Sequence, residues 1–124
     1  MVNSGWWMVK DYKELEVWKK GIALVLASYE IVQKFPGDER FALTNQIKRS
    51  AISIPSNIAE GASRNTTKEF VQFLYIALGS ASELETQMII AEKLGYIKNN
   101  QNLISEITII RKMLNALITS LKKC

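Results

Sequence analysis

Histidine is absent from the 124-residue sequence, and cysteine occurs once, as Cys124. Without histidine the chain cannot build a Ser-His-Asp or Cys-His nucleophile, a Cys/His zinc site or the Glu-x-x-His iron site of ferritin-like bundles. We therefore predict no catalytic residues, no metal ligands and no cofactor, and we expect the protein not to be an enzyme. The enzymatic alternative is a magnesium site made of carboxylates alone, such as Glu60 or Glu83.

Long apolar runs are also absent, since the longest, residues 22–27, is far shorter than the ~20 residues that span a bilayer. Residues 1–8 lack the basic and apolar segments of a secretory signal. A single cysteine cannot form an internal disulfide and agrees with a reducing compartment. We expect a cytoplasmic protein with no membrane partner.

Prolines number only two and glycines six, and between them four segments repeat apolar residues at spacings of three and four, the signature of a helix with one buried face. The first segment has Leu15, Trp18, Ile22, Val25, Tyr29 and Val32. The second has Leu43, Ile47, Ala51, Ile54 and Ile58. The third has Phe70, Leu74, Ala77, Ala81, Leu84, Met88 and Ala91. The fourth has Leu103, Ile107, Ile110, Leu114, Leu117 and Leu121.

Short connections between long helices favour antiparallel neighbours, so the sequence predicts an all-α, antiparallel up-down-up-down four-helix bundle. We expect residues 1–9 to form a flexible leader and residues 10–124 to form the bundle.

Polar residues, glycine and proline mark the expected helix ends. Asp11 with Glu14 predicts a capping box at the start of the first helix, Asp38 predicts the N-cap of the second, and Thr66 with Glu69 predicts a capping box for the third. The fourth is expected from about Asn100. The apolar period continues in phase past Pro55, so we expect a kink there rather than a helix end.

Small residues, among them Gly79 and Ser80, interrupt the third segment and predict a notch for close helix packing rather than an anion-binding cradle.

Basic residues are concentrated in the fourth segment, where residues 98–124 contain five cations and one acid. Eleven-residue spacings place four of the cations in one adjoining strip, because eleven residues are close to three helical turns. A strip of this kind can bind a phosphate backbone. The alternative is that lysines near a helix C-terminus are there because they stabilise the helix dipole. The candidate phosphate contacts are Lys48, Arg49, Arg64, Arg111, Lys112, Lys122 and Lys123.

A polar stripe borders the apolar face of the second segment and consists of Gln46, Arg49, Ser53, Asn57, Glu60 and Arg64. Serine, asparagine and glutamine are mediocre helix formers, so specific partners explain them better than solvent does. One interpretation is an internal network in which Arg49 or Arg64 pairs with Glu83 or Glu85 of the third segment. The other is an interface between protomers or with a partner.

Several motifs keep a fixed order along the chain: Gln-x-x-Arg at residues 46–49, Ser-Ile-x-x-Asn-Ile-x-Glu-Gly at residues 53–61, Arg64, Gly79-Ser80 and Glu83-x-Glu85. With them, the sequence from about residue 8 onward resembles the four-helix-bundle proteins encoded in intervening sequences of bacterial 23S ribosomal RNA. The resemblance assigns the signature positions to Gln46, Arg49, Ser53, Asn57, Glu60, Gly61, Arg64, Gly79, Ser80, Glu83 and Glu85.

The resemblance implies a bundle that assembles into a ring, typically a homopentamer. It also implies a relationship to the accessory variability determinant of diversity-generating retroelements, a basic barrel that binds nucleic acid and its reverse transcriptase. Two functions follow. The first is an oligomeric adaptor that binds RNA or DNA. The second is a scaffold that binds a protein partner and no nucleic acid.

Overall fold

A computed structural model of the protein describes residues 11–123, so the predicted leader at residues 1–9 lies outside the described part. Four α-helices make up most of it: α1 (Glu16–Val32), α2 (Leu43–Ala62), α3 (Thr67–Lys93) and α4 (Gln101–Lys122). Two short 3₁₀ helices, η2 (Tyr12–Glu14) and η3 (Gly37–Glu39), precede α1 and α2. No strand occurs within this range.

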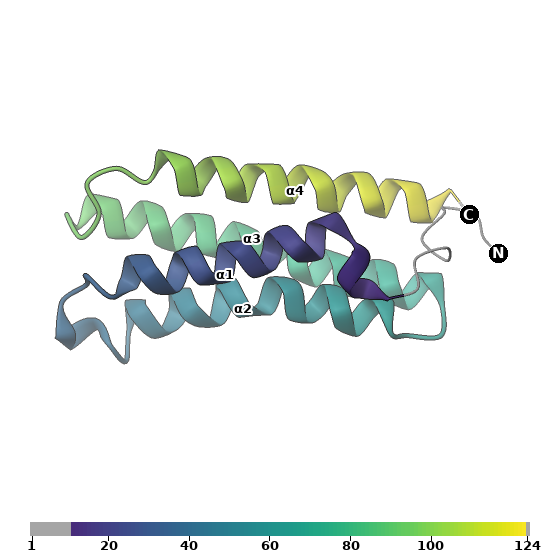
Figure 1. Ribbon diagram of the computed structural model, residues 1–124, viewed down its shortest axis with the longest axis horizontal. Coiled ribbons are helices and arrows are strands. Elements are labelled where there is room, and N and C mark those ends of the chain that lie inside the picture. Colours follow the sequence, from purple (N-terminus) through teal and green to yellow (C-terminus); the bar gives the residue numbers. More distant parts are fainter. Residues whose placement is uncertain (1–10, 124) are drawn as a thin grey trace.

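The four helices run alternately up and down and lie side by side in two pairs (Figure 1). Each helix contacts the next one in the chain, and α1 also contacts α4, which closes the bundle. The diagonal pairs, α1 with α3 and α2 with α4, make no close backbone approach in the described range. The predicted antiparallel four-helix bundle is confirmed.

The predicted apolar face of α3 is buried at all seven of its positions, from Phe70 to Ala91. In α2, four of the five predicted positions are fully buried and Leu43 packs at the margin of the core. In α4, Ile118 takes the buried place predicted for Leu117, which is half-buried beside it. The core therefore lies where the period-three-and-four pattern of these three helices places it.

The predicted face of α1 is confirmed only in part, because Leu15, Trp18 and Val25 pack against the margin of the core. The buried residues of α1 are Val17, Gly21, Leu24, Ser28 and Val32, so Val32 alone is shared with the prediction. Ile22 is 36% exposed. Gly21 explains the difference, because a Cβ atom built there would lie 3.3 Å from Cβ of Pro55. Small residues thus face α2 where the helices approach closely, and the larger apolar residues are rotated towards the surface.

Two predicted helix starts are also wrong. The Asp11 carboxylate accepts a hydrogen bond from the Lys13 amide at 3.0 Å and so caps η2, whereas α1 begins at Glu16. Asp38 lies inside η3, and α2 begins five residues later, at Leu43. In both places a short 3₁₀ turn contains or follows the residue that was expected to cap the α-helix, and the α-helix begins after that turn.

The α3 start and the continuity of α2 agree with the prediction, and the kink expected at Pro55 stays a prediction. The Thr66 hydroxyl accepts a hydrogen bond from the Glu69 amide at 3.1 Å and caps α3. Helix α2 continues through Pro55 as one helix.

A partly buried hydrogen bond joins the α1–α2 connection to the α3–α4 connection at one end of the bundle. The Tyr96 hydroxyl donates to Oε2 of Glu39 at 2.6 Å, and the Tyr96 ring packs on Phe35 with 5.3 Å between ring centroids. This hydrogen bond to Glu39 raises the pKa of Tyr96 above its ordinary value of 10.0, with further contributions from burial and from the charges of Glu39 and Asp38. The phenol is therefore held in its neutral form.

Alkaline titration should weaken this end of the bundle. Because the folded-state pKa of Tyr96 is raised, its stabilising contribution is complete below pH 10 and is lost as the pH rises through the folded-state value. We expect Tyr96→Phe to flatten the fall in melting temperature above pH 10. Spectrophotometric titration of the wild type should show one tyrosine that ionises at higher pH than the others, and this step should be missing in Tyr96→Phe. In Glu39→Gln the pKa of Tyr96 should be lower than in the wild type. Ionisation of Tyr96 at or below pH 10 would contradict the assignment.

Candidate nucleic-acid interface

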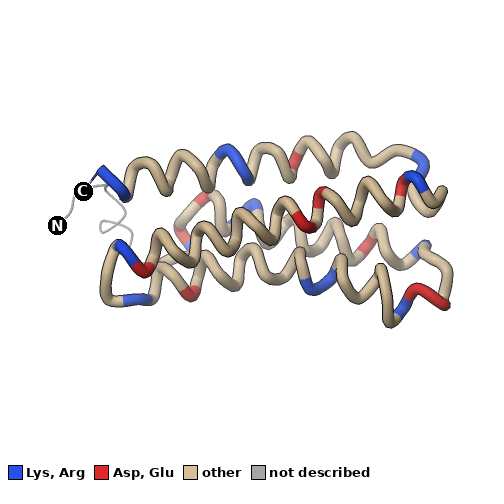
Figure 2. The backbone as a smooth tube through the Cα atoms, turned by 180° about the vertical axis from the view of Figure 1, so that it is seen from behind, with Lys and Arg blue, Asp and Glu red and all other residues tan. Residues whose placement is uncertain are grey.

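Helix α4 carries the basic strip that the sequence predicts. Lys112, Lys122 and Lys123 are exposed, and none of them pairs with an acid in residues 11–123. Figure 2 shows positively charged residues at the C-terminal end of α4 and near its middle. The single acid of the helix is Glu106. The strip is therefore a surface of one sign on one helix.

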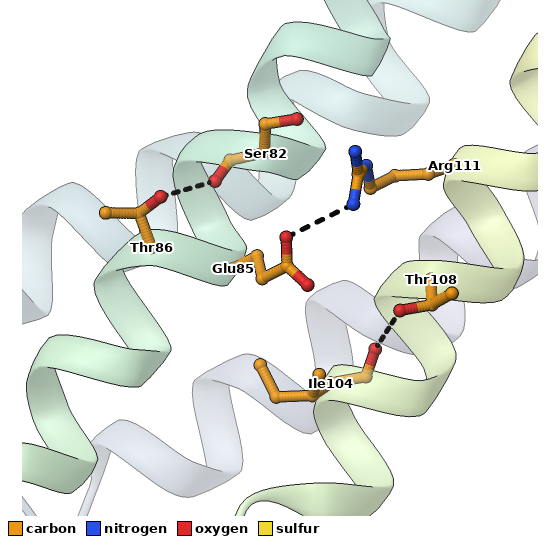
Figure 3. Close-up of polar contacts among 6 residues, drawn as sticks. All are labelled: Ser82, Glu85, Thr86, Ile104, Thr108 and Arg111. Carbon is orange, nitrogen blue, oxygen red and sulfur yellow. Dashed lines mark hydrogen bonds and ion pairs between the residues drawn. The ribbon is translucent and has the colours of Figure 1, made fainter.

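Arg111, the fourth cation of the strip, is partly neutralised by α3. Its Nη1 atom lies 3.2 Å from Oε1 of Glu85, and the two side chains point towards one another across the gap between the helices (Figure 3). The Arg111 side chain is 40% exposed and that of Glu85 is 24% exposed. The Nε atom of Arg111 is buried and has no hydrogen-bond partner in the described chain. Arg111 thus joins α4 to α3 and offers only part of its guanidinium to a ligand.

Lys122 lies beside an exposed aromatic residue of α3. Its Nζ atom is 3.4 Å from the Tyr75 hydroxyl and 5.8 Å from the ring centroid. The Tyr75 side chain is 47% exposed. The α3–α4 face therefore presents an aromatic ring next to the last cation of α4.

The three other predicted phosphate contacts belong to α2 and the connection after it. Nζ of Lys48 lies 4.8 Å from the ring centroid of Tyr29, on the α1 side of α2. Arg49 is exposed and has no ion pair in the described residues. Arg64 pairs with Glu60 at 3.5 Å and covers the ring of Phe73 at 4.8 Å.

The seven predicted contacts do not form one surface on a single chain. Helices α2 and α4 are diagonal partners in the bundle, and Figure 2 shows their cations on different sides of it. The cations on α4 and those on α2 are therefore two separate surfaces.

The middle of the polar stripe of α2 is an internal network. The Ser53 hydroxyl accepts hydrogen bonds from the Asn57 amide and from the buried Ser80 hydroxyl of α3, each at 2.8 Å. Asn57 also donates to the Ser53 carbonyl at 2.8 Å. These bonds join α2 to α3 at the centre of their contact.

The predicted partners of the arginines are wrong, however. Glu85 pairs with Arg111, and Arg64 pairs with Glu60 of its own segment. Glu83 is exposed and forms no ion pair in the described range. Arg49 and Arg64 do not pair with Glu85, because Glu85 lies on the side of α3 that faces α4. Gln46 and Arg49 at the margin of the stripe are exposed and open to a partner, and Glu60 is exposed but pairs with Arg64.

The family model for the 23S rRNA-intervening sequence protein matches residues 13–116. The chain belongs to this family. A crystal structure of a protein of unknown function of the S23 ribosomal protein family, from Bacteroides thetaiotaomicron, is similar with a TM-score of 0.76 and 26% identity, over 83% of this chain and 95% of that one. A comparison with curated proteins gives no match. The resemblance predicted from the motifs is confirmed.

Two glycines among the signature positions of the family have opposite environments. A Cβ built on Gly61 would lie 2.7 Å from Cβ of Phe73, so α2 and α3 are in direct contact there. A Cβ built on Gly79 would meet nothing within 4 Å, and the residue is exposed. The prediction of a packing notch is therefore wrong for Gly79, while its neighbour Ser80 is buried against α2.

Sequence reasoning missed Tyr75 as a member of this surface. Tyr75 falls outside the heptad positions of its segment, which shows that it is not a core residue. Its proximity to Lys122, 47 residues away, depends on how α3 and α4 pair and has no local signal.

Neither a metal site nor a membrane span is found in the described part of the chain. No group of three or more acidic, histidine or cysteine side chains there could hold a metal ion. None of the helices from α1 to α4 combines the length and the apolar character required to cross a membrane.

Proposed function

We propose that the protein is a non-enzymatic, homo-oligomeric adaptor of the cytoplasm that binds RNA or DNA through the cations of α4. One observation carries this proposal: Lys112, Lys122 and Lys123 are exposed on one helix with no acidic partner among residues 11–123. Free cations in a row release counterions from a phosphate backbone when they bind it, and this is the main source of sequence-independent affinity.

The helix dipole accounts for only part of this strip. Lys122 and Lys123 lie at the C-terminal end of α4, where the dipole favours cations. Lys112 is ten residues earlier, in the middle of the helix, where the effect of the dipole has decayed. An exposed lysine at that place extends the positive surface over the C-terminal half of α4 and supports a ligand that runs along this half of the helix.

Self-association is supported by apolar residues that the bundle leaves uncovered. Leu26 of α1 is 68% exposed, and Ile22 lies one turn before it on the same helix. Ile52 is 41% exposed and follows Lys48 of α2 by one turn, on the side that faces Tyr29 of α1. Ile76, Ile89 and Ile90 of α3 are exposed as well, and apolar surface that one chain leaves uncovered is typical of an interface. A ring of five copies is the assembly that the family resemblance implies.

The test compares two triple variants with the same loss of charge. Lys112→Gln/Lys122→Gln/Lys123→Gln removes the free cations of α4, and Lys34→Gln/Lys93→Gln/Lys98→Gln removes three exposed cations from the other end of the bundle. We expect the α4 variant to lower the slope of log affinity against log salt by about 2–3, because each lost phosphate contact contributes about 0.7–0.9. The control variant should change the slope by less than half of that.

Failure of the unmodified protein to bind RNA or DNA oligonucleotides at low salt would refute the proposal. If the two triple variants lost the same affinity, binding would depend on the net charge of the protein and not on the surface of α4. Light scattering on the same samples gives the mass of the assembly and tests the pentamer.

The second candidate is a protein-binding scaffold, which the uncovered apolar residues of α1 and α2 favour. The Leu26→Glu variant places a negative charge among these exposed apolar residues and should disrupt any assembly that depends on them. If this variant keeps the wild-type mass while the protein binds no polyanion, the apolar residues serve a different protein and the scaffold is the better assignment.

A further inference from the structure

We infer that the α3–α4 face binds single-stranded rather than double-stranded nucleic acid, with Tyr75 as the ring on which a base stacks and Lys122 as the adjoining phosphate contact. This inference rests on the proposed function and adds to it the class of ligand. A duplex keeps its bases paired inside and offers an exposed tyrosine only its backbone, whereas an unpaired base is free to stack.

The position of Tyr75 suits a stacking surface. Almost half of the side chain is open to solvent, although tyrosine is a large, partly apolar residue. Nζ of Lys122 is within 3.4 Å of the hydroxyl, at the edge of the ring, rather than over its face. A cation at the edge of an exposed ring can bind a phosphate while the ring face stays free for the attached base.

Gly79 keeps the space beside this ring empty. It follows Tyr75 by four residues in α3, and the side chain of a helical residue leans back over the residue four positions before it. Any other residue at this position would extend a side chain towards the ring. A Cβ there would meet nothing within 4 Å, so no packing within the chain requires the glycine. The space is available to a ligand.

Cations lie beside the ring and towards one end of the bundle. Lys68 is exposed and precedes Tyr75 by seven residues, two helical turns, so it lies on the same side of α3. Lys122 lies opposite Tyr75 on α4, and Lys123 follows it. Because α3 and α4 are antiparallel (Figure 1), Lys68 and Lys123 lie towards the same end of the bundle, whereas Lys112 lies ten residues before Lys122 in the other direction. A strand that runs along α4 past Tyr75 therefore meets Lys112 on one side of the ring and the cations of this end on the other.

Within residues 11–123, Phe41 is the other exposed aromatic residue with a neighbouring cation, and it provides a matched control. Its side chain is 86% exposed, and the Arg40 guanidinium lies 5.8 Å from its ring centroid. The two residues before Arg40 are the acids Asp38 and Glu39, which repel a phosphate backbone. Phe41 thus has the ring and the cation but the wrong surrounding charge.

The experiment measures binding of oligouridine and of an RNA duplex of equal length by the full chain and three variants. Tyr75→Leu should lower affinity for oligouridine about 5- to 100-fold, the range measured when a stacking aromatic residue is removed, and should leave duplex affinity and the salt slope unchanged. Gly79→Gln should also weaken oligouridine binding, while the higher helix propensity of glutamine raises the melting temperature. Phe41→Leu should bind both probes as the wild type does.

The possible results separate this inference from the proposed function. If Tyr75→Leu binds oligouridine as tightly as the wild type, or if Phe41→Leu loses as much affinity, stacking at Tyr75 is refuted. Loss of affinity in the α4 lysine variant would then still support the proposed function. If the wild type binds neither probe at low salt, both ideas fail.

Discussion

Replacing Leu24 with alanine is expected to lower the free energy of unfolding by about 2–5 kcal/mol, the range for removing a large buried aliphatic side chain. Leu24 is only 3% exposed and lies at the middle of the α1 face that packs in the core. Thermal or urea unfolding followed by circular dichroism measures the change. A loss of this size is a large part of the stability of a small domain.

Ile22→Ala is the matched control, because it removes a side chain of similar size two residues earlier, from another side of α1. Since Ile22 is 36% exposed, we expect a loss of about 1 kcal/mol or less. The opposite ranking would show that the face with Trp18 and Ile22 is the buried one, and that α1 is rotated relative to the structure described above. Assembly can protect Ile22, so the comparison is made at the lowest workable protein concentration.

Gly61→Ala is expected to destabilise the protein by about 2 kcal/mol, although alanine is the better helix former. The new methyl group would lie 2.7 Å from Cβ of Phe73 and 2.9 Å from Cδ1 of Phe70. The first of these atoms is fixed to the α3 backbone, so α2 and α3 would have to move apart. The melting temperature should fall by several degrees.

Gly79→Ala is the control for this change and should have the opposite sign. The same substitution in the open part of α3 should stabilise the protein by about 0.5–1 kcal/mol, because alanine loses less conformational entropy in a helix and the added methyl group has free space. If both alanine substitutions stabilised the protein, or both destabilised it, the difference in local packing at Gly61 and Gly79 would not determine the stability change.

The fold could be predicted because the apolar residues of α2, α3 and α4 recur without a break at spacings of three and four. In α3 all seven predicted positions from Phe70 to Ala91 are buried, although Ile76, Ile89 and Ile90 leave further apolar residues on its exposed side. In α1 apolar residues surround more than half of the helix, so periodicity alone does not select the buried side. The decisive residue is Gly21, whose contact with Pro55 is a property of two helices and not of either sequence segment.

The basic strip of α4 was predictable because all of its residues belong to one helix, in which spacing defines position. The partners of the charged residues were not. Arg111 and Glu85 are 26 residues apart, and their pairing depends on the register between α3 and α4. Glu83 and Glu85 are two residues apart and so lie on different sides of the helix, but their spacing does not show which of these sides faces α2.

Diagonal placement of α2 and α4 has a consequence for how this protein holds a polyanion. Cations on the two helices lie on different sides of the bundle, so a straight strand that runs along α4 leaves Arg49 unoccupied. Under the proposed function the strand is held by α4, and a strand that also reached Arg49 would have to pass around the full width of the bundle.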